Sequence, residues 1–254
     1  MSGTGRTGDG RGRLGSVLSG LAVAVGCVLF LGGFAWGAVV YRPYAVPTES
    51  MTPTLRAGDR VLAQQIDGEE VRRGDVVVFT DPDWGDMPMV KRVVGIGGDE
   101  VACCDQGRLT INGEAVEESY LRKGEPASGH PFTADVPEGR LFLLGDERRS
   151  SLDSRVRLDD AGQGSVPRDA VRARVDAVVW PMDGMVRPAD AFASLPGGIS
   201  SPGPLRLQLG AVVVGVVLIL AGSAYGPVAA WSARAARKRR SAQDGRPAQE
   251  ARSS

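Results

Sequence analysis

The chain has 254 residues, of which 30 are Lys or Arg and 30 are Asp or Glu, so its formal net charge at pH 7 is zero. This balance excludes the basic excess that is typical of nucleic-acid-binding domains, and no nucleic-acid partner is expected. Two long apolar segments enclose about 160 residues, which is enough to bury a single core of ordinary size.

The first predicted element is a transmembrane helix over residues 17–41. This segment is almost wholly apolar and has no charged residue, and about 25 residues at roughly 1.5 Å each exceed the thickness of a hydrocarbon core. Arginines precede it, as they do in a cleaved signal peptide, but its apolar run is longer than a signal-peptide core of about 7 to 15 residues. We therefore interpret it as an uncleaved anchor that follows a short cytoplasmic tail, residues 1–16.

Residues 42–206 are predicted to form a mainly β domain. The expected strands are short, β-branched or alternating in polarity, and bounded by Gly, Asp and Pro. They are Arg60–Ala63, Asp75–Phe79, Val90–Ile96, Leu109–Ile111, Leu141–Leu144 and Val171–Trp180. Asn112 and Gly113 both accept the positive φ of a tight hairpin turn that leads into Glu114–Val116. No long amphipathic helix interrupts these segments, so the predicted fold is an antiparallel β-sheet domain, which a Gly-, Ser- and Pro-rich linker over 195–204 connects back to the membrane.

A second transmembrane helix is predicted over residues 207–231, and its apolar part is Leu207–Tyr225. Arg and Lys residues follow it between 234 and 240, and such cations favour the cytoplasm. The alternative, a buried core helix, is less favoured because the remaining residues, 232–254, form a basic tail that we expect to be disordered and unable to cover it. With both tails inside, the β domain is expected on the extracytoplasmic face of the cell membrane.

The three cysteines indicate no metal or cofactor site. Cys27 lies inside the first apolar segment, where it is expected to be a packing residue. Cys103 and Cys104 are adjacent in the outer domain, where oxidation is possible. A bridge between sequence neighbours is strained and uncommon, so two reduced thiols remain at least as favoured. No metal-ligand spacing surrounds the pair.

Ser50 and Lys91 are the candidate catalytic residues. A serine hydroxyl is a poor nucleophile until a base takes its proton, and the usual base is histidine. The only histidine, His130, lies in a polar stretch bounded by Gly and Pro and is expected to be a solvated loop residue. Lysine could serve instead, because burial among apolar neighbours such as Val90 and Val93 can lower its pKa from about 10.4 by several units.

Four sequence blocks follow one another between residues 50 and 155. The first block is Ser50-Met51-Thr52-Pro53-Thr54-Leu55 with Gly58-Asp59, and the second is Gly74-Asp75-Val76-Val77-Val78-Phe79. The third is Lys91-Arg92-Val93-Val94-Gly95-Ile96 with Gly98-Asp99, and the fourth is Gly145-Asp146-Glu147-Arg148 followed by Ser151 and Asp153-Ser154-Arg155. In their residues and their order, these blocks resemble those of the bacterial type I signal peptidases. The lysine at position 91, in place of histidine, favours the bacterial type over the endoplasmic-reticulum type.

The resemblance implies a membrane-tethered β-sheet serine endopeptidase that uses no cofactor. Its partners would be the lipid bilayer and secretory preproteins, whose signal peptides it would remove after small-x-small sites; it implies no particular oligomeric state. Ser50 would be the nucleophile and Lys91 the general base. The backbone N–H of Ser50 and the hydroxyl of Thr48 would form the oxyanion hole. Three further positions would support the site: Ser151 as a hydrogen-bond partner of the lysine amine, Asp153 and Arg155 as an ion pair, and Asp146 in the same block.

The sequence departs from the family pattern at three places. Gly97 stands where proline is frequent, Glu147 where asparagine is usual, and Arg149 where a small polar residue is common. None of these changes removes a proposed catalytic group. Two other interpretations remain: an autoproteolytic Ser/Lys protein related to the SOS-response repressors, which would need a cleavable partner domain before the core, and a non-enzymatic surface β domain.

Overall fold

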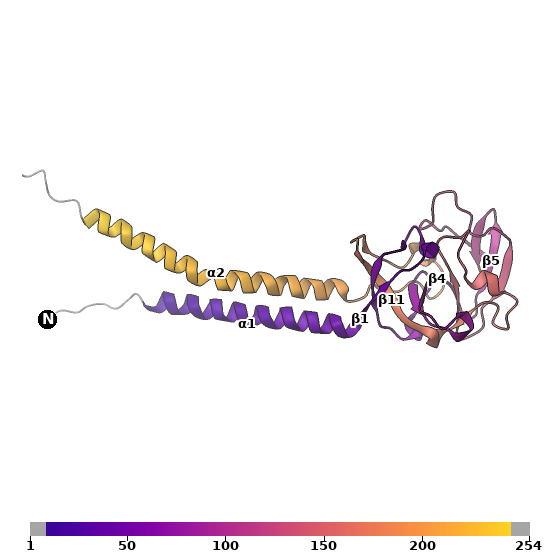
Figure 1. Ribbon diagram of the computed structural model, residues 1–254, viewed down its shortest axis with the longest axis horizontal. Coiled ribbons are helices and arrows are strands. Elements are labelled where there is room, and N and C mark those ends of the chain that lie inside the picture. Colours follow the sequence, from indigo (N-terminus) through magenta and orange to yellow (C-terminus); the bar gives the residue numbers. More distant parts are fainter. Residues whose placement is uncertain (1–8, 245–254) are drawn as a thin grey trace, which may run out of the picture. The chain divides into compact units, whose positions relative to one another are not determined.

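The computed structural model describes residues 9–244 and divides into two units (Figure 1). One unit is helical and contains residues 9–37 and 205–244, and the other is the β unit of residues 38–204. The predictions for residues 1–8 and 245–254 lie outside the described residues.

The helical unit consists of α1 (Asp9–Val40) and α2 (Leu205–Asp244). Both are long and apolar enough to cross a membrane, over Gly15–Val40 and Leu205–Tyr225. Within this unit the helices touch through small residues, because a Cβ atom added at Gly26 would lie 2.8 Å from the carbonyl oxygen of Gly215. The hydroxyl of Ser19 also donates to the carbonyl of Gly222 at 2.7 Å. Such small-residue contacts are typical of helix pairs in membranes.

Helix α2 continues beyond its predicted end at residue 231. Residues 232–244, which we expected to be disordered, are helical. Ala, Arg and Lys dominate this stretch, and these are among the strongest helix formers, so a run of charge extends the helix instead of ending it. In the same way α1 begins at Asp9, inside the predicted tail of residues 1–16.

The β unit contains two sheets in which every pairing is antiparallel, as predicted. The larger sheet has the order β1-β2-β11-β3-β4-β9-β10, with β12 paired to β11. Its strands are β1 (Tyr41–Ala45), β2 (Arg60–Gln64), β3 (Val76–Phe79), β4 (Met89–Ile96), β9 (Arg140–Leu144), β10 (Val166–Pro167), β11 (Val171–Trp180) and β12 (Gly184–Met185). The smaller sheet has the order β7-β6-β5-β8, from β5 (Glu100–Asp105), β6 (Arg108–Ile111), β7 (Glu114–Val116) and β8 (Phe132–Asp135).

The predicted strands are all present, and Asn112 and Gly113 form the predicted turn between β6 and β7 with φ values of 54° and 80°. Strands β1, β5, β8, β10 and β12 were not predicted. Buried side chains join the two sheets: Val94 and Phe142 from the larger sheet belong to one core cluster with Val101 and Leu109 from the smaller.

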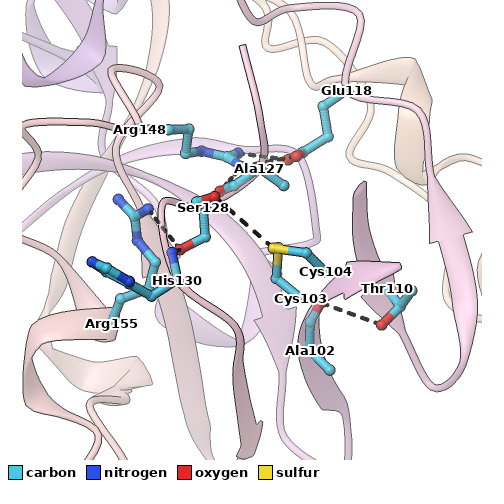
Figure 2. Close-up of a disulfide and its surroundings, with 10 residues drawn as sticks. All are labelled: Ala102, Cys103, Cys104, Thr110, Glu118, Ala127, Ser128, His130, Arg148 and Arg155. Atoms are coloured by element: carbon cyan, nitrogen blue, oxygen red, sulfur yellow. Dashed lines mark hydrogen bonds and ion pairs between the residues drawn. A yellow bond between two sulfur atoms is a disulfide. The ribbon is translucent and has the colours of Figure 1, made fainter. Parts of the chain in front are cut away.

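Cys103 and Cys104 form a disulfide on β5, which settles the question that the sequence left open. Figure 2 shows the bridge facing the loop before β8, where Sγ of Cys104 lies 3.9 Å from the carbonyl oxygen of Ser128. The hydroxyl of Ser128 in turn accepts from the guanidinium of Arg155 at 3.5 Å. The bridge therefore supports a loop that contacts the fourth sequence block.

Candidate active site

Ser50 lies in a short 3₁₀ turn, Glu49–Met51, between β1 and β2. The next residue, Met51, is fully buried in a core cluster with Val76 and Val78, so the turn is anchored to the larger sheet. Ser50 itself is half-buried. The turn thus presents the serine at the surface of a fixed core.

Lys91 extends from β4 toward this turn. It pairs with Val77 of β3 in the sheet register and is only 5% exposed. Its Nζ atom donates a hydrogen bond to Oγ of Ser50 at 2.9 Å. The structure therefore brings together the two residues that the sequence predicts as base and nucleophile.

Burial lowers the pKa of Lys91 below its ordinary value, whereas the negative charges of Asp153 and Asp146 raise it. Burial is the largest effect because an ammonium group loses hydration inside a protein. A lysine with a lowered pKa has a larger fraction of neutral amine near neutral pH, and only the neutral amine can accept a proton from a hydroxyl.

Thr48 lies beside Ser50, at the start of the same turn. Its Oγ1 atom is 3.1 Å from Oγ of Ser50, and either hydroxyl can be the donor. The Thr48 side chain is exposed and lines the same cavity as Ser50. It is therefore free to turn its hydroxyl toward a molecule bound there.

Asp146 occupies the centre of a buried polar network behind the site. Arg92, the residue after Lys91, donates two hydrogen bonds to its carboxylate at 2.9 and 2.7 Å. The hydroxyl of Thr54, in the nucleophile block, also donates to Asp146. The guanidinium of Arg92 further stacks 4.1 Å above the ring of Tyr120. This network connects the first, third and fourth sequence blocks.

Arg92 and Tyr120 were not among the predicted site residues. A signal for Arg92 exists in the sequence, because a buried strand that contains an arginine needs a buried acidic partner. Nothing in the local sequence singles out Tyr120, which reaches the network from the segment after β7.

Asp153 and Arg155 form the predicted ion pair, with Nη2 of Arg155 2.7 Å from Oδ2 of Asp153. The same carboxylate oxygen accepts a hydrogen bond from the backbone N–H of Gly145 at 2.9 Å. Asp153 is fully buried. The pair therefore fixes the start of the Gly145-Asp146 block as well as contributing charge near Lys91.

Ser151 does not make the predicted hydrogen bond to Lys91. Its hydroxyl is buried and has no hydrogen-bond partner within the described chain. It packs against Gly145, where an added Cβ atom would collide with both this hydroxyl and the carbonyl oxygen of Ser50. The prediction is corrected in this respect: Ser151 lies beside the site, but its hydroxyl contacts the backbone at Gly145 and makes no hydrogen bond to the amine.

Glu147, one of the departures from the family pattern, contributes its backbone to the site. Its N–H donates to the carbonyl oxygen of Ser50 at 3.1 Å. Its side chain pairs at 2.9 Å with Arg122, which lies in the segment between β7 and β8. His130 is exposed in the loop before β8, as predicted.

Ser50 and Lys91 open into a cavity of about 340 Å³. Its walls include Met51, Met89, Val90 and Leu152 and are mostly apolar. Val76–Val78 do not line it and are buried in the core. Among the described residues no group of three or more His, Cys, Asp or Glu side chains could hold a metal ion.

Known proteins resemble this chain over the region of the site. The sequence model of the family described as "Signal peptidase, peptidase S26" matches residues 17–180. A "Probable signal peptidase I" of Mycobacterium leprae is 32% identical over 200 residues, covering 56% of this chain and 69% of that protein. A "Signal peptidase I" of Bacillus licheniformis is 36% identical over 156 residues, covering 58% of this chain and 80% of that protein. A crystal structure of a signal peptidase I from Enterococcus faecalis aligns with a TM-score of 0.34 at 31% identity, covering 41% of this chain and 94% of that one.

Proposed function

The chain belongs to the signal peptidase family, peptidase S26, and we propose that it removes the signal peptides of exported preproteins after small-x-small sites by a serine–lysine mechanism. The observation that carries this proposal is the 2.9 Å contact between Nζ of Lys91 and Oγ of Ser50. The relatives named as signal peptidase I support the choice of substrate.

In the first half of the reaction the neutral amine of Lys91 takes the proton of Ser50 as Oγ attacks the scissile carbonyl carbon. The resulting ammonium then gives this proton to the leaving amine, and the C–N bond breaks to leave an acyl-enzyme. In the second half, Lys91 takes a proton from a water molecule that attacks the ester, and returns it to Oγ of Ser50. One lysine can serve in all four proton transfers because burial lowers its pKa and so increases the fraction of neutral amine.

The oxyanion that forms in each half needs hydrogen-bond donors that are already in place. We assign this role to the backbone N–H of Ser50 and the hydroxyl of Thr48. Thr48 supports this assignment by its position, since its Oγ1 lies 3.1 Å from the nucleophilic oxygen. The ion pair of Arg92 with Asp146 and that of Arg155 with Asp153 hold the strands and turns that carry these groups.

The proposal extends to the membrane. Residues 17–41 and 207–231 would anchor the chain, residues 42–206 would form the extracytoplasmic peptidase domain, and residues 1–16 and 232–254 would lie in the cytoplasm. The short connection of about nine residues from residue 41 to Ser50 keeps the nucleophile within about 32 Å of the end of the first apolar segment. A translocated signal peptide would present its cleavage site at this level, with small residues at the first and third positions before the cut.

The test is cleavage of a purified preprotein by the full-length protein in detergent. Wild type should cut once after an Ala-x-Ala sequence, and Ser50→Ala and Lys91→Ala should each abolish processing, since nucleophile and base act as a unit. Lys91→Arg should also be inactive because a guanidinium stays protonated in this pH range.

Two exposed residues give matched controls, Ser201→Ala for the serine and Lys123→Ala for the lysine, and both variants should process normally. Substantial turnover by Lys91→Ala, together with its loss in His130→Ala, would overturn the assignment of the base. No cleavage of any preprotein by folded wild type would overturn the proposed substrate.

A further inference from the structure

The chain continues beyond the family match, which ends at residue 180, and we call residues 186–204 the strap. We predicted the part from residue 195 as a linker, but in the structure the strap belongs to the β unit. Phe192 and Leu195 are buried in the same core cluster as Val94 and Leu144 of the larger sheet. The strap is therefore packed into the domain.

Three polar contacts of the strap converge on consecutive residues, Arg73, Gly74 and Asp75. Oγ of Ser200 donates to Oδ2 of Asp75 at 2.6 Å. Nη1 of Arg73 donates to the carbonyl of Pro196 at 2.6 Å, and the N–H of Ala189 donates to the carbonyl of Gly74 at 3.2 Å. Arg73 and Asp75 are both buried, so these are interior contacts.

The residues held by the strap are bonded directly to the strand of the catalytic lysine. The N–H of Gly74 donates to the carbonyl of Val93 at 2.8 Å, and the N–H of Val93 donates to the carbonyl of Asp75 at 2.9 Å. Nη1 of Arg92 also donates to the carbonyl of Gly74 at 2.8 Å. These bonds extend the β3–β4 pairing in which Lys91 faces Val77. The strap thus fixes the part of β4 that immediately follows Lys91.

Ser200 donates a side-chain hydrogen bond to the buried carboxylate of Asp75, which has few other hydrogen-bond partners. Asp75 is 1% exposed, and its Oδ1 atom has no hydrogen-bond partner within the described chain. Burial raises the pKa of Asp75, and the hydrogen bonds from the Ser200 hydroxyl and the Arg72 backbone lower it. The charges that act on this carboxylate, Arg174 and Asp176, come from β11. Removing the Ser200 hydroxyl would leave a buried carboxylate with only the backbone donor of Arg72 to its Oδ2.

We propose that the strap is needed to hold Lys91 in its active position. Within the strap, Ser200 is a positioning residue for Lys91 and acts through Asp75 and Val93. This inference rests on the proposed function. Without the Ser200 hydroxyl the Asp75 turn relaxes, the end of β4 loosens, and water gains access to the amine of Lys91. Better hydration stabilises the ammonium form and raises the pKa of Lys91, so a smaller fraction of the amine is neutral and able to accept a proton at pH 7.

The experiment compares full-length wild type, Ser200→Ala, Ser200→Thr and Ser201→Ala in detergent, with kcat/KM for a preprotein measured as a function of pH. Ser200→Ala should lower kcat/KM at pH 7 by about tenfold, which is less than the roughly 10²-fold loss that a misplacement of about 1 Å can cause. The acid limb of its profile should move to higher pH. Ser200→Thr keeps the hydroxyl and should restore most of the activity and the position of the limb. Ser201→Ala, an exposed neighbour, should match wild type.

Thermal unfolding of each variant separates positioning from simple loss of fold. If the acid limb of Ser200→Ala coincides with that of wild type, either at full activity or at activity reduced only in proportion to the unfolded fraction, the inference is wrong. If Ser200→Ala does not fold, the acid limbs of Ser200→Thr and Asp75→Asn decide the question, because both variants keep a polar group at the contact between positions 75 and 200. A wild type that cleaves no preprotein contradicts the proposed function, whereas a cleaving wild type with an indifferent Ser200 contradicts only this inference.

Discussion

Asp153 opposes the effect of burial on Lys91. Burial lowers the pKa of the lysine, and the nearby negative charge of Asp153 raises it again. The aspartate is itself held by Arg155 and by the N–H of Gly145. The pKa of the proposed base is therefore set by burial, which is the larger effect, and by the opposing charges of Asp153 and Asp146.

The first prediction is that removing this charge makes the base effective at lower pH. In the double variant Asp153→Asn/Arg155→Gln both partners become neutral, so no unpaired buried charge is left behind. The ammonium form of Lys91 loses its attraction to Asp153, its pKa falls, and the acid limb of kcat/KM should move to lower pH by roughly half a unit or more. A pH profile with a preprotein substrate measures this shift. A limb that moves to higher pH would contradict the assignment of Lys91 as the titrating base.

The second prediction concerns the stability cost of a buried base. Lys91→Met keeps the length of the side chain and removes the amine, so the variant should be inactive but more stable at pH 7 by about 1–3 kcal/mol. The pKa of Lys91 is lowered in the folded state. The lysine therefore reduces the free energy of unfolding by its full amount at pH values below this folded-state pKa. This reduction declines as the pH rises toward the pKa of the unfolded chain. Urea unfolding at pH 7 and pH 10 checks this, and a difference that grows with pH would refute it.

The third prediction concerns Thr48. Thr48→Val preserves the shape of the side chain and removes its hydroxyl, which is proposed to bind charge that develops only in the transition state. We expect kcat to fall by roughly 10²-fold or more with little change in KM. Thr48→Ser retains a donor and should be nearly silent. Steady-state kinetics on both variants decide the matter, and an unaffected valine variant would reduce Thr48 to a turn residue.

Local chemistry explains which parts of the fold were predictable. The turn at Asn112 and Gly113 and the strand Val171–Trp180 follow from neighbouring residues alone, and both occur where expected. Ser50 and Lys91 are 41 residues apart, and their contact was predicted through the resemblance of whole sequence blocks and not through any local pattern. The helix over residues 232–244 was not predicted, because the charge of this stretch was interpreted as a sign of disorder. The high helix propensity of its Ala, Arg and Lys residues was not taken into account.

Contacts between distant residues account for what the sequence did not reveal. Ser200 and Asp75 are 125 residues apart, and a Gly-, Ser- and Pro-rich segment carries no periodic signal that would indicate burial. Ser151 shows that a residue can be placed correctly from the sequence while its hydrogen bonds are not. A matching residue type placed it near the site, but the direction of its hydroxyl depends on how closely it packs against Gly145.

The last prediction concerns orientation in the membrane. Basic residues precede the apolar part of α1 in the sequence, and basic residues follow the apolar part of α2. Because such residues favour the cytoplasm, both ends of the chain should be cytoplasmic. Protease added to the outside of cells, once the folded domain is loosened enough to be cut, should digest residues 42–206 and spare tags at either terminus. A matched sample of permeabilised cells should lose both tags. A C-terminal tag that is accessible from outside intact cells would mean that α2 does not span, and the assignment of Ser50 and Lys91 would stand because all four sequence blocks precede this helix.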